Sequence, residues 1–314
     1  MVLDSATLYY RAFYALPTSM TGPDGRPNNA LRGFFDGLAG LVTRLRPTHL
    51  VCAWDADWRP EFRVQLWPAY KRHRVAEVSE AASDDELIEE VPDELGPQVD
   101  TLAELLDGLG ISRVGVAGFE ADDVIATVCA RSDMPVDIVT SDRDLLQCVD
   151  DSRSVRLISI ARGLRDPQVL DESAVLERYG VLPQQYVDFA TLRGDPSDGL
   201  PGVPGVGEKT AAALIREFGG LTRLVDALAQ PAGVAGTTPT ALKPAVRSRI
   251  AAVIETLDPM ARVTTAVTDV PLPARWQDAA ALPAVPRREG LAGCESAGVT
   301  RQLGALVAAG VVAR

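Results

Sequence analysis

RVGVAGFEADD (113–123) and VDIVTSDRD (136–144) each pass from a strand-like apolar run into a group of acidic residues. The same transition occurs at Asp4 and at Asp55, which also follow apolar runs directly. Patterns typical of strands lie at 2–3, 49–54, 113–117, 136–140 and 155–160. Patterns typical of helices lie at 28–46, 98–109, 121–131 and 143–149. This alternation predicts an α/β fold with a parallel sheet.

The acidic residues occupy the same position in each motif, directly after a predicted strand. They are Asp4, Asp55, Glu120, Asp122, Asp123, Asp142 and Asp144. Because the carboxyl ends of parallel strands meet at one edge of a sheet, we expect these side chains to share a site. Cations would relieve their repulsion, and oxygen ligands suit Mg²⁺ or Mn²⁺, a pair of which can promote phosphodiester hydrolysis. For any single motif, a helix cap is the simpler interpretation.

The composition is that of a globular protein, since the 314 residues are 46% hydrophobic and 24% charged. No apolar run is long enough to span a membrane, and the N-terminus does not resemble a secretory signal. We therefore expect a cytoplasmic protein without a membrane partner. Four cysteines without a C-x-x-C pair, together with two histidines, supply a zinc site poorly. The net charge of −12 argues against general nucleic-acid binding unless basic residues are concentrated.

Basic residues are concentrated in WRPEFRVQLWPAYKRHR (58–74), where aromatic residues interleave with them. This stretch opens an insertion at about 59–95 that then becomes strongly acidic. Cations of this kind bind a phosphate backbone, and aromatic rings stack on unpaired bases. The alternatives are a solvated basic helix face and tryptophans that belong to the core.

A glycine-rich stretch, GDPSDGLPGVPGVGEKTA (194–211), adds the carboxylates Asp195 and Asp198 and leads into a predicted helix at 208–218. Glycines let a backbone approach a phosphate closely, and the N-terminus of the following helix offers free N–H groups. The spacing of a nucleotide P-loop is absent. PGVPGVGEKTA instead has the helix–hairpin–helix form, which grips a duplex backbone irrespective of base sequence.

Together these motifs resemble the bacterial 5′-nuclease family, which includes stand-alone flap endonucleases and the 5′→3′ exonuclease domain of DNA polymerase I. The resembling stretches are YRAFYAL (10–16), FRVQLWPAYKRHR (62–74), GFEADD (118–123), TSDRDLLQC (140–148), GDPSDGLPGVPGVGEKTA (194–211) and TDVPLP (268–273). The resemblance covers about residues 1–273, with the motif order intact.

The resemblance implies a PIN-like parallel-sheet nuclease core, a helical arch and a helix–three-turn–helix element. It also implies that nine carboxylates, the seven above with Asp195 and Asp198, surround two ions of Mg²⁺ or Mn²⁺. Since nine exceed what two ions need, a third metal position is a further hypothesis. The implied catalytic residues are Lys71, Arg74, Asp122 and Asp142. The side chains of Lys71 and Arg74 are expected to contact the scissile phosphate.

The resemblance places DNA contacts on the arch and on the hairpin. Tyr70 is expected to help position the terminal unpaired base, and the hairpin to hold the downstream duplex, with a K⁺ ion on its carbonyl groups as an open hypothesis. The predicted DNA-binding residues are Arg11, Arg63, Tyr70, Arg72, Gly202, Gly205, Gly207, Lys209 and Thr210.

Three regions follow from these patterns. They are a PIN-like core at 1–180 that contains the arch insertion, a helix–hairpin–helix region at 181–258, and a C-terminal segment at 259–314 that packs back on the core. Helical patterns dominate the second region, with a flexible loop expected around 230–240.

We therefore predict a structure-specific 5′-nuclease that acts on branched or nicked DNA, functionally beside a DNA polymerase and a ligase. The alternatives are a PIN-type ribonuclease and a non-catalytic protein that binds branched DNA. Three departures from the family pattern stand out. Ser5 replaces the glycine after the first aspartate, Gly199 replaces the asparagine after the last Ser-Asp, and residues 77–95 are unusually acidic.

Overall fold

A six-stranded sheet forms the centre of the computed structural model, which describes residues 1–76, 89–229 and 240–313. The strands are β1 (Val2–Asp4), β2 (Val51–Ala53), β3 (Arg113–Val114), β4 (Val136–Thr140), β5 (Val155–Ser159) and β6 (Gln168–Leu170). Their order is β3-β2-β1-β4-β5-β6, and only β5 and β6 pair antiparallel. The predicted parallel α/β fold is confirmed, and the antiparallel edge strand β6 adds to it.

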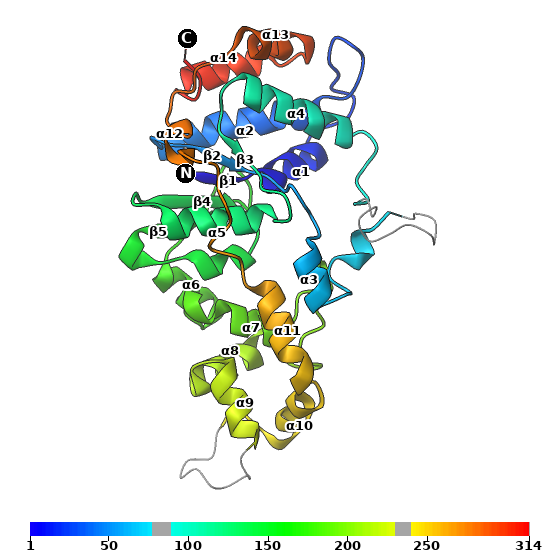
Figure 1. The fold of residues 1–314 in the computed structure, drawn as a ribbon, viewed down its shortest axis with the longest axis vertical. Helices are drawn as coiled ribbons and strands as arrows, with labels where there is room; N and C mark the ends of the chain where they lie inside the picture. Colours follow the sequence, from blue (N-terminus) through cyan, green and yellow to red (C-terminus); the bar gives the residue numbers. More distant parts are fainter. Residues whose placement is uncertain (77–88, 230–239, 314) are drawn as a thin grey trace.

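Helices cover both faces of this sheet, because successive residues of each strand point to opposite sides (Figure 1). Val2 of β1 belongs to one hydrophobic cluster, together with Val124 of α5 (Ala121–Arg131). Leu3 belongs to the other, together with Phe34 of α2 (Asn29–Leu45) and Leu106 of α4 (Gly96–Gly108). Burial of each large apolar side chain contributes about 1.5–3 kcal/mol. The helix α1 (Ser5–Ala15) packs along α2.

Two predicted elements differ in the structure. The strand expected at 113–117 ends at Val114, because the chain turns there and the Phe119 N–H donates to the Val116 carbonyl (3.0 Å). The helix expected at 143–149 is a 3-10 helix, Asp144–Cys148, that follows β4 directly. Both turns lie next to predicted carboxylates and so set their positions.

A helical region follows the sheet. Its helices are α6 (Glu172–Tyr179), α7 (Tyr186–Arg193), α8 (Glu208–Phe218), α9 (Leu221–Ala229), α10 (Pro244–Ala252) and α11 (Ile254–Thr264). In Figure 1, α8, α9 and α10 lie at one end of the molecule, and α11 leads back towards the sheet. The flexible loop expected around 230–240 falls almost entirely outside the described residues.

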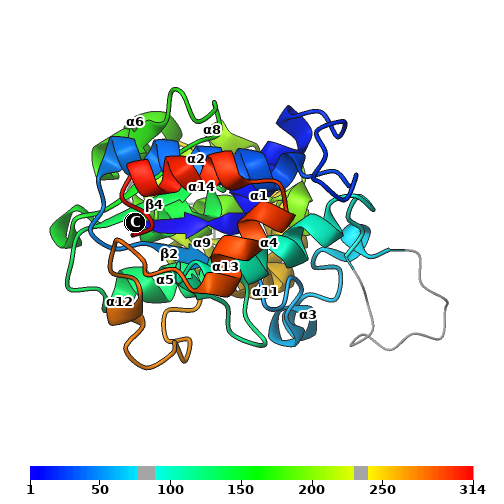
Figure 2. The same cartoon turned by 90° about the horizontal axis from the view of Figure 1, so that it is seen from above.

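The last helices are α12 (Trp276–Ala279), α13 (Arg288–Ser296) and α14 (Thr300–Ala308). Figure 2 shows α13 beside α4 and α14 along α2, and both pairs are in contact. The approach of α13 is close, since a Cβ on Gly290 would lie 2.3 Å from the Gly108 carbonyl oxygen. The C-terminal helices therefore cover the outer side of the helices that flank the sheet.

The inserted basic stretch forms the helix α3 (Glu61–Leu66) and a short 3-10 helix, Arg72–Arg74. α3 contacts α11, which joins the insertion to the helical region. Most of the acidic segment 77–95 lies outside the described residues. Among the residues that are described, no helix has both the length and the apolar character needed to cross a membrane.

Candidate active site

An acidic pocket of about 730 Å³ opens at the carboxyl edge of the sheet. Five predicted carboxylates line it, namely Asp4, Asp55, Glu120, Asp122 and Asp142. They follow β1, β2, β3 and β4, four neighbouring strands whose carboxyl ends share one edge. Lys71, Arg74 and Arg11 line the same pocket. The structure thus brings predicted carboxylates and predicted phosphate-binding cations together.

Hydrogen bonds fix the carboxylates at the pocket floor. Asp4 caps α1 by accepting from the Thr7 N–H (3.1 Å), and the Thr140 hydroxyl donates to its other oxygen (2.7 Å). Asp55 accepts from the Ala121 N–H (2.9 Å) at the start of α5. The helix-cap interpretation therefore applies to Asp4, and capping holds this side chain in the pocket.

The environment raises the pKa values of these carboxyl groups. Burial raises the pKa of Asp122 well above its ordinary range, and the neighbouring carboxylates Asp142 and Asp4 raise it further. Burial also raises the pKa of Asp55 to about 7, against the opposing effects of the Ala121 N–H and of Lys71. Carboxylates that share a pocket favour a proton or a cation between them.

A second group of carboxylates lies beside Asp142. Burial raises the pKa of Asp144 well above its ordinary range, and Asp142, Asp198 and Asp195 raise it further in that order. Burial raises the pKa of Asp198 to about 6. The Oδ1 atom of Asp144 is buried and has no hydrogen-bond partner. A buried acceptor without a donor is costly, so this oxygen suits a cation.

Hard divalent ions fit this set of residues, because every available ligand is a carboxylate oxygen. Within 1–76, 89–229 and 240–313, no three acidic, histidine or cysteine side chains are arranged to hold an ion as they stand. Carboxylates that share a pocket repel one another, and a bound cation would relieve this repulsion.

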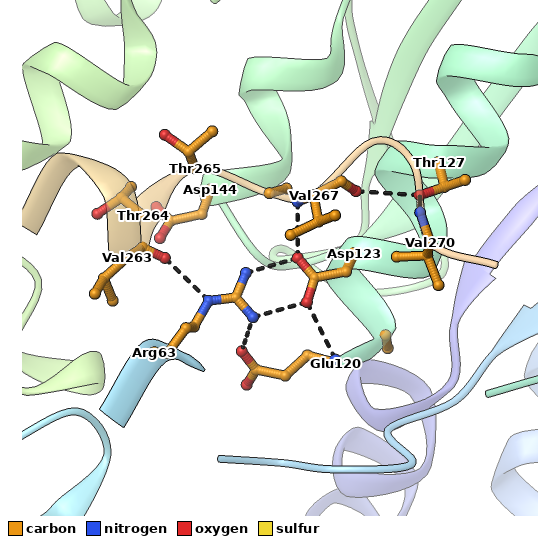
Figure 3. A network of polar contacts seen from close by, with 12 residues as sticks. Arg63, Glu120, Asp123, Thr127, Asp144, Val263, Thr264, Thr265, Val267 and Val270 are labelled. Carbon is orange, nitrogen blue, oxygen red and sulfur yellow. Dashed lines mark hydrogen bonds and ion pairs between the residues drawn. The ribbon is translucent and has the colours of Figure 1, made fainter. Parts of the chain in front are cut away.

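Arg63 was predicted to bind DNA and Asp123 to bind a metal ion, and the structure instead places both in a buried ion pair. Arg63, of which 3% is exposed, pairs with Glu120 (2.5 Å) and with the fully buried Asp123 (2.7 Å). Its Nε atom donates to the Val263 carbonyl (3.0 Å), and Asp123 accepts from the Val267 N–H (2.9 Å), as Figure 3 shows. Buried charges need such partners. Arg63 is therefore not available to DNA. Asp123 does not line the pocket and is not available to a metal ion, whereas Glu120 pairs with Arg63 and also lines the pocket.

Tyr70 was expected to position an unpaired base, and the structure places it in the interior instead. Its ring is buried, and its hydroxyl donates to Glu120 (2.8 Å), so it offers no face to an unpaired base. Tyr10 and Tyr14 line the pocket instead, and 71% of Tyr14 is exposed. Their spacing of four residues places both on one face of α1. That spacing is the signal in the sequence that points to these two side chains.

The remaining cations of the arch lie on the accessible side. Lys71 is half-buried and pairs with Glu120. Arg74 is half-buried in the wall of the pocket, and Arg72 is exposed. Arg11 lines the pocket and donates to the Ala161 carbonyl (3.2 Å).

The predicted hairpin precedes α8, which begins at Glu208 as expected. Gly202 is buried and serves the packing of the turn rather than a ligand. The accessible predicted residues here are Gly205, Gly207, Lys209 and Thr210. Arg249 of α10 joins them, because its Nη1 atom donates to the Gly205 carbonyl (3.3 Å). No pattern in the sequence points to Arg249, which meets the hairpin only through the fold.

A parallel sheet with an acidic carboxyl edge, followed by a helical region, defines a two-part protein. Residues 1–180 match the family model described as the N-terminal resolvase-like domain of 5′-3′ exonuclease. Residues 181–286 match the model of its C-terminal SAM fold. The chain belongs to the 5′-3′ exonuclease family, so the resemblance to bacterial 5′-nucleases is confirmed.

Individual proteins agree with this assignment. A 5′-3′ exonuclease of Streptomyces coelicolor is 50% identical over 300 residues, which are 93% of this chain and 96% of that protein. DNA polymerase I of Mycobacterium bovis is 40% identical over 276 residues, which are 87% of this chain and 27% of that protein. A bacteriophage T5 flap endonuclease in complex with DNA and metal ions has a similar fold, with a TM-score of 0.61 at 18% identity over 98% of both chains.

Proposed function

We propose that this protein is a structure-specific 5′-nuclease that hydrolyses DNA phosphodiesters near a 5′ end, as a flap endonuclease and 5′→3′ exonuclease. The observation that carries the proposal is the acidic pocket, in which carboxylates from four strand ends lie beside Lys71. Membership in the 5′-3′ exonuclease family supports the reaction. The complex of the bacteriophage flap endonuclease with DNA supports the class of substrate.

Each part of the pocket has a role in this proposal. The ion-binding carboxylates are Asp4, Asp55, Glu120, Asp122 and Asp142, with Asp144, Asp195 and Asp198 in the second group. Mg²⁺ or Mn²⁺ ions held there supply Lewis-acid chemistry for phosphodiester hydrolysis. Lys71 and Arg74 bind and orient the scissile phosphate, since both line the pocket. Tyr10 and Tyr14 provide faces on which unpaired bases stack.

The duplex beside the cleavage site binds to the hairpin. Lys209 and Arg249 are exposed there, and the N-terminus of α8 adds backbone N–H groups that favour a phosphate. The substrate is branched or nicked DNA with a 5′ end, as arises beside a DNA polymerase and a ligase in replication and repair. A K⁺ ion on the hairpin carbonyl groups and a cytoplasmic, nucleoid-associated location belong to the same proposal.

The decisive experiment uses labelled 5′-flap substrates of DNA and of RNA with Mg²⁺, Mn²⁺ or EDTA. We expect cleavage of the DNA flap with either ion and none in EDTA. Preferential cleavage of the RNA flap would favour a ribonuclease. Asp122→Ala should abolish cleavage and leave flap binding intact, while the exposed Asp258→Ala serves as a control. Binding without cleavage by the unaltered chain under every ion would instead indicate a non-catalytic junction-binding protein.

A third ion position is part of the proposal, because Asp144, Asp195 and Asp198 form a group of their own beside Asp142. Anomalous scattering from crystals soaked in Mn²⁺ tests it directly. Three peaks are expected at the carboxyl edge of the sheet, and two peaks at saturating Mn²⁺ would contradict the third position.

A further inference from the structure

The segment that carries Lys71 is fastened to the turn that carries Asp198. We call residues 67–74 the arch base and residues 195–199 the acidic turn. Four hydrogen bonds join them, from Trp67 Nε1 to the Gly199 carbonyl (3.1 Å), from the Lys71 N–H to the Asp198 carbonyl (3.1 Å), and from Arg74 Nη2 to the Ser197 carbonyl (2.7 Å) and to Asp198 Oδ1 (3.4 Å). Three of the four acceptors are backbone carbonyls, so the contact depends on how closely the two backbones approach.

Gly199 permits this approach. Its φ of 73° lies in the left-handed region, and a Cβ at this position would lie 2.6 Å from the Ala69 carbonyl oxygen and 3.7 Å from the Lys71 nitrogen. Such a collision with backbone cannot be relieved by a side-chain rotation. Any side chain at this position would therefore hold the arch base further from the acidic turn.

The contact holds the backbone of Lys71. Lys71 itself has a left-handed backbone, with a φ of 47°, and its N–H is held by the Asp198 carbonyl. Its side chain then reaches into the pocket and pairs with Glu120. The acidic turn continues within a few residues into the hairpin, whose Gly202 packs against Gly194. The backbone thus links the duplex-binding hairpin to the catalytic lysine.

We propose that Gly199 is a positioning residue that fixes the Lys71 amine in the pocket by letting the arch base dock on the acidic turn. The duplex-binding hairpin and the catalytic lysine are then held as one unit before substrate arrives. The inference rests on the proposed nuclease function only for its kinetic consequence. The contact itself can be measured without DNA.

Two variants at one position separate the collision from backbone strain. Gly199→Ala introduces both a Cβ and a left-handed alanine, whereas Gly199→Asn introduces the Cβ with a residue that tolerates left-handed backbone. Gly25→Ala is the matched control, because its φ is 79° and nothing lies within 4 Å of the added Cβ. We expect both Gly199 variants to lose about 10²-fold in kcat on a 5′-flap, since a small misplacement of a catalytic group has effects of that size. The KM of both Gly199 variants should be almost unchanged, and Gly25→Ala should keep almost the same kcat and KM as the unaltered protein.

Amine acylation supplies a readout that does not need activity. In the unaltered protein without DNA, the pairing with Glu120 should protect Lys71 from an acylating reagent, as read by mass spectrometry of the peptide. Both Gly199 variants should be acylated faster at Lys71, with Gly25→Ala unchanged. Trp67→Phe, which removes the N–H that donates to the Gly199 carbonyl together with part of the indole ring, should act in the same direction more weakly. This variant provides a test if the Gly199 variants do not fold.

Gly199→Asn with unaltered kcat and unaltered Lys71 acylation would overturn the inference. A raised KM with unaltered kcat would overturn it too, because it would assign Gly199 to DNA binding. If the unaltered chain fails to cleave any flap, the proposed function fails, and the acylation rates still decide whether Gly199 positions Lys71.

Discussion

Replacement of Arg63 tests whether the buried salt-bridge cluster of Arg63, Glu120 and Asp123 stabilises the fold. The guanidinium makes four hydrogen bonds, two from Nη1 (2.5 Å and 2.8 Å), one from Nη2 (2.7 Å) and one from Nε (3.0 Å). Three of the four go to the carboxylates of Glu120 and Asp123, both of which are buried. Arg63→Met keeps most of the side-chain volume and removes the positive charge. Two buried carboxylates then lose their principal counter-charge.

The magnitude follows from burial rather than from the number of bonds. Removing one partner of a buried pair typically costs about 3–5 kcal/mol, because the remaining charge is left uncompensated. Lys71 and Tyr70 still donate to Glu120, whereas Asp123 keeps only backbone N–H donors, so Asp123 should account for most of the loss. We therefore expect Arg63→Met to lower the free energy of unfolding by about 3–5 kcal/mol.

The assay is denaturant unfolding of the metal-free protein at neutral pH. Arg301→Met is the control, because Arg301 pairs with Asp36 (2.5 Å) at the surface with 74% of its side chain exposed. Exposed pairs contribute about 0–1 kcal/mol. Adding Asp123→Asn to Arg63→Met removes the orphaned charge and should recover part of the stability. A loss for Arg63→Met no larger than that of Arg301→Met would refute the structural role assigned to the cluster.

Three further predictions concern pH, packing and DNA. Burial raises the folded-state pKa of Asp55 to about 7, so the stability from its bound proton is complete below an ordinary carboxyl pKa of about 4 and is lost as the pH rises through about 7. In EDTA the melting temperature should fall as the pH rises from about 5 to about 8, and Mg²⁺ should offset the loss. Melting temperatures in EDTA that are equal at both pH values would contradict this prediction. Gly290→Ala should destabilise by about 1–3 kcal/mol, because its Cβ would lie 2.3 Å from the Gly108 backbone, whereas Gly304→Ala in open space on α14 should be neutral or stabilising in thermal unfolding. Lys209→Ala should weaken flap binding and lower the slope of log K against log salt by about 1, and an unchanged slope would count against a phosphate contact.

Alternation of strands and helices was sufficient to predict the sheet, because periodicity along a strand or helix is a local property of sequence. The helix at 121–131 coincides with α5, and the helix at 208–218 coincides with α8. The expected helix at 143–149 is a tighter 3-10 turn, which depends on how the chain packs after β4. The antiparallel strand β6 is three residues long and only its pairing with β5 identifies it.

The roles of side chains were harder to predict than their neighbourhood. Asp122 and Asp123 are adjacent in the sequence and look equivalent there. In the structure, Asp122 lines the pocket and Asp123 faces Arg63, because adjacent residues on a helix point about 100° apart. Arg63 and Tyr70 look like DNA ligands within a basic aromatic stretch. Arg63 is buried because α3 packs against α11, a contact between residues far apart in the chain. Tyr70 is buried with its hydroxyl on Glu120, which also lies far away in the sequence.

Asp142 lines the pocket and also lies beside the second carboxylate group, and this position predicts how metal binding responds to substitution. Its carboxylate raises the pKa of Asp122 on the pocket side and that of Asp144 in the second group. Ions placed in the two groups would both be near Asp142, so Asp142→Asn should weaken binding at both, whereas Asp4→Asn should weaken only the pocket. A Mn²⁺ titration that counts bound ions separates these cases. If Asp142→Asn and Asp4→Asn lose the same single ion, the two groups do not share Asp142.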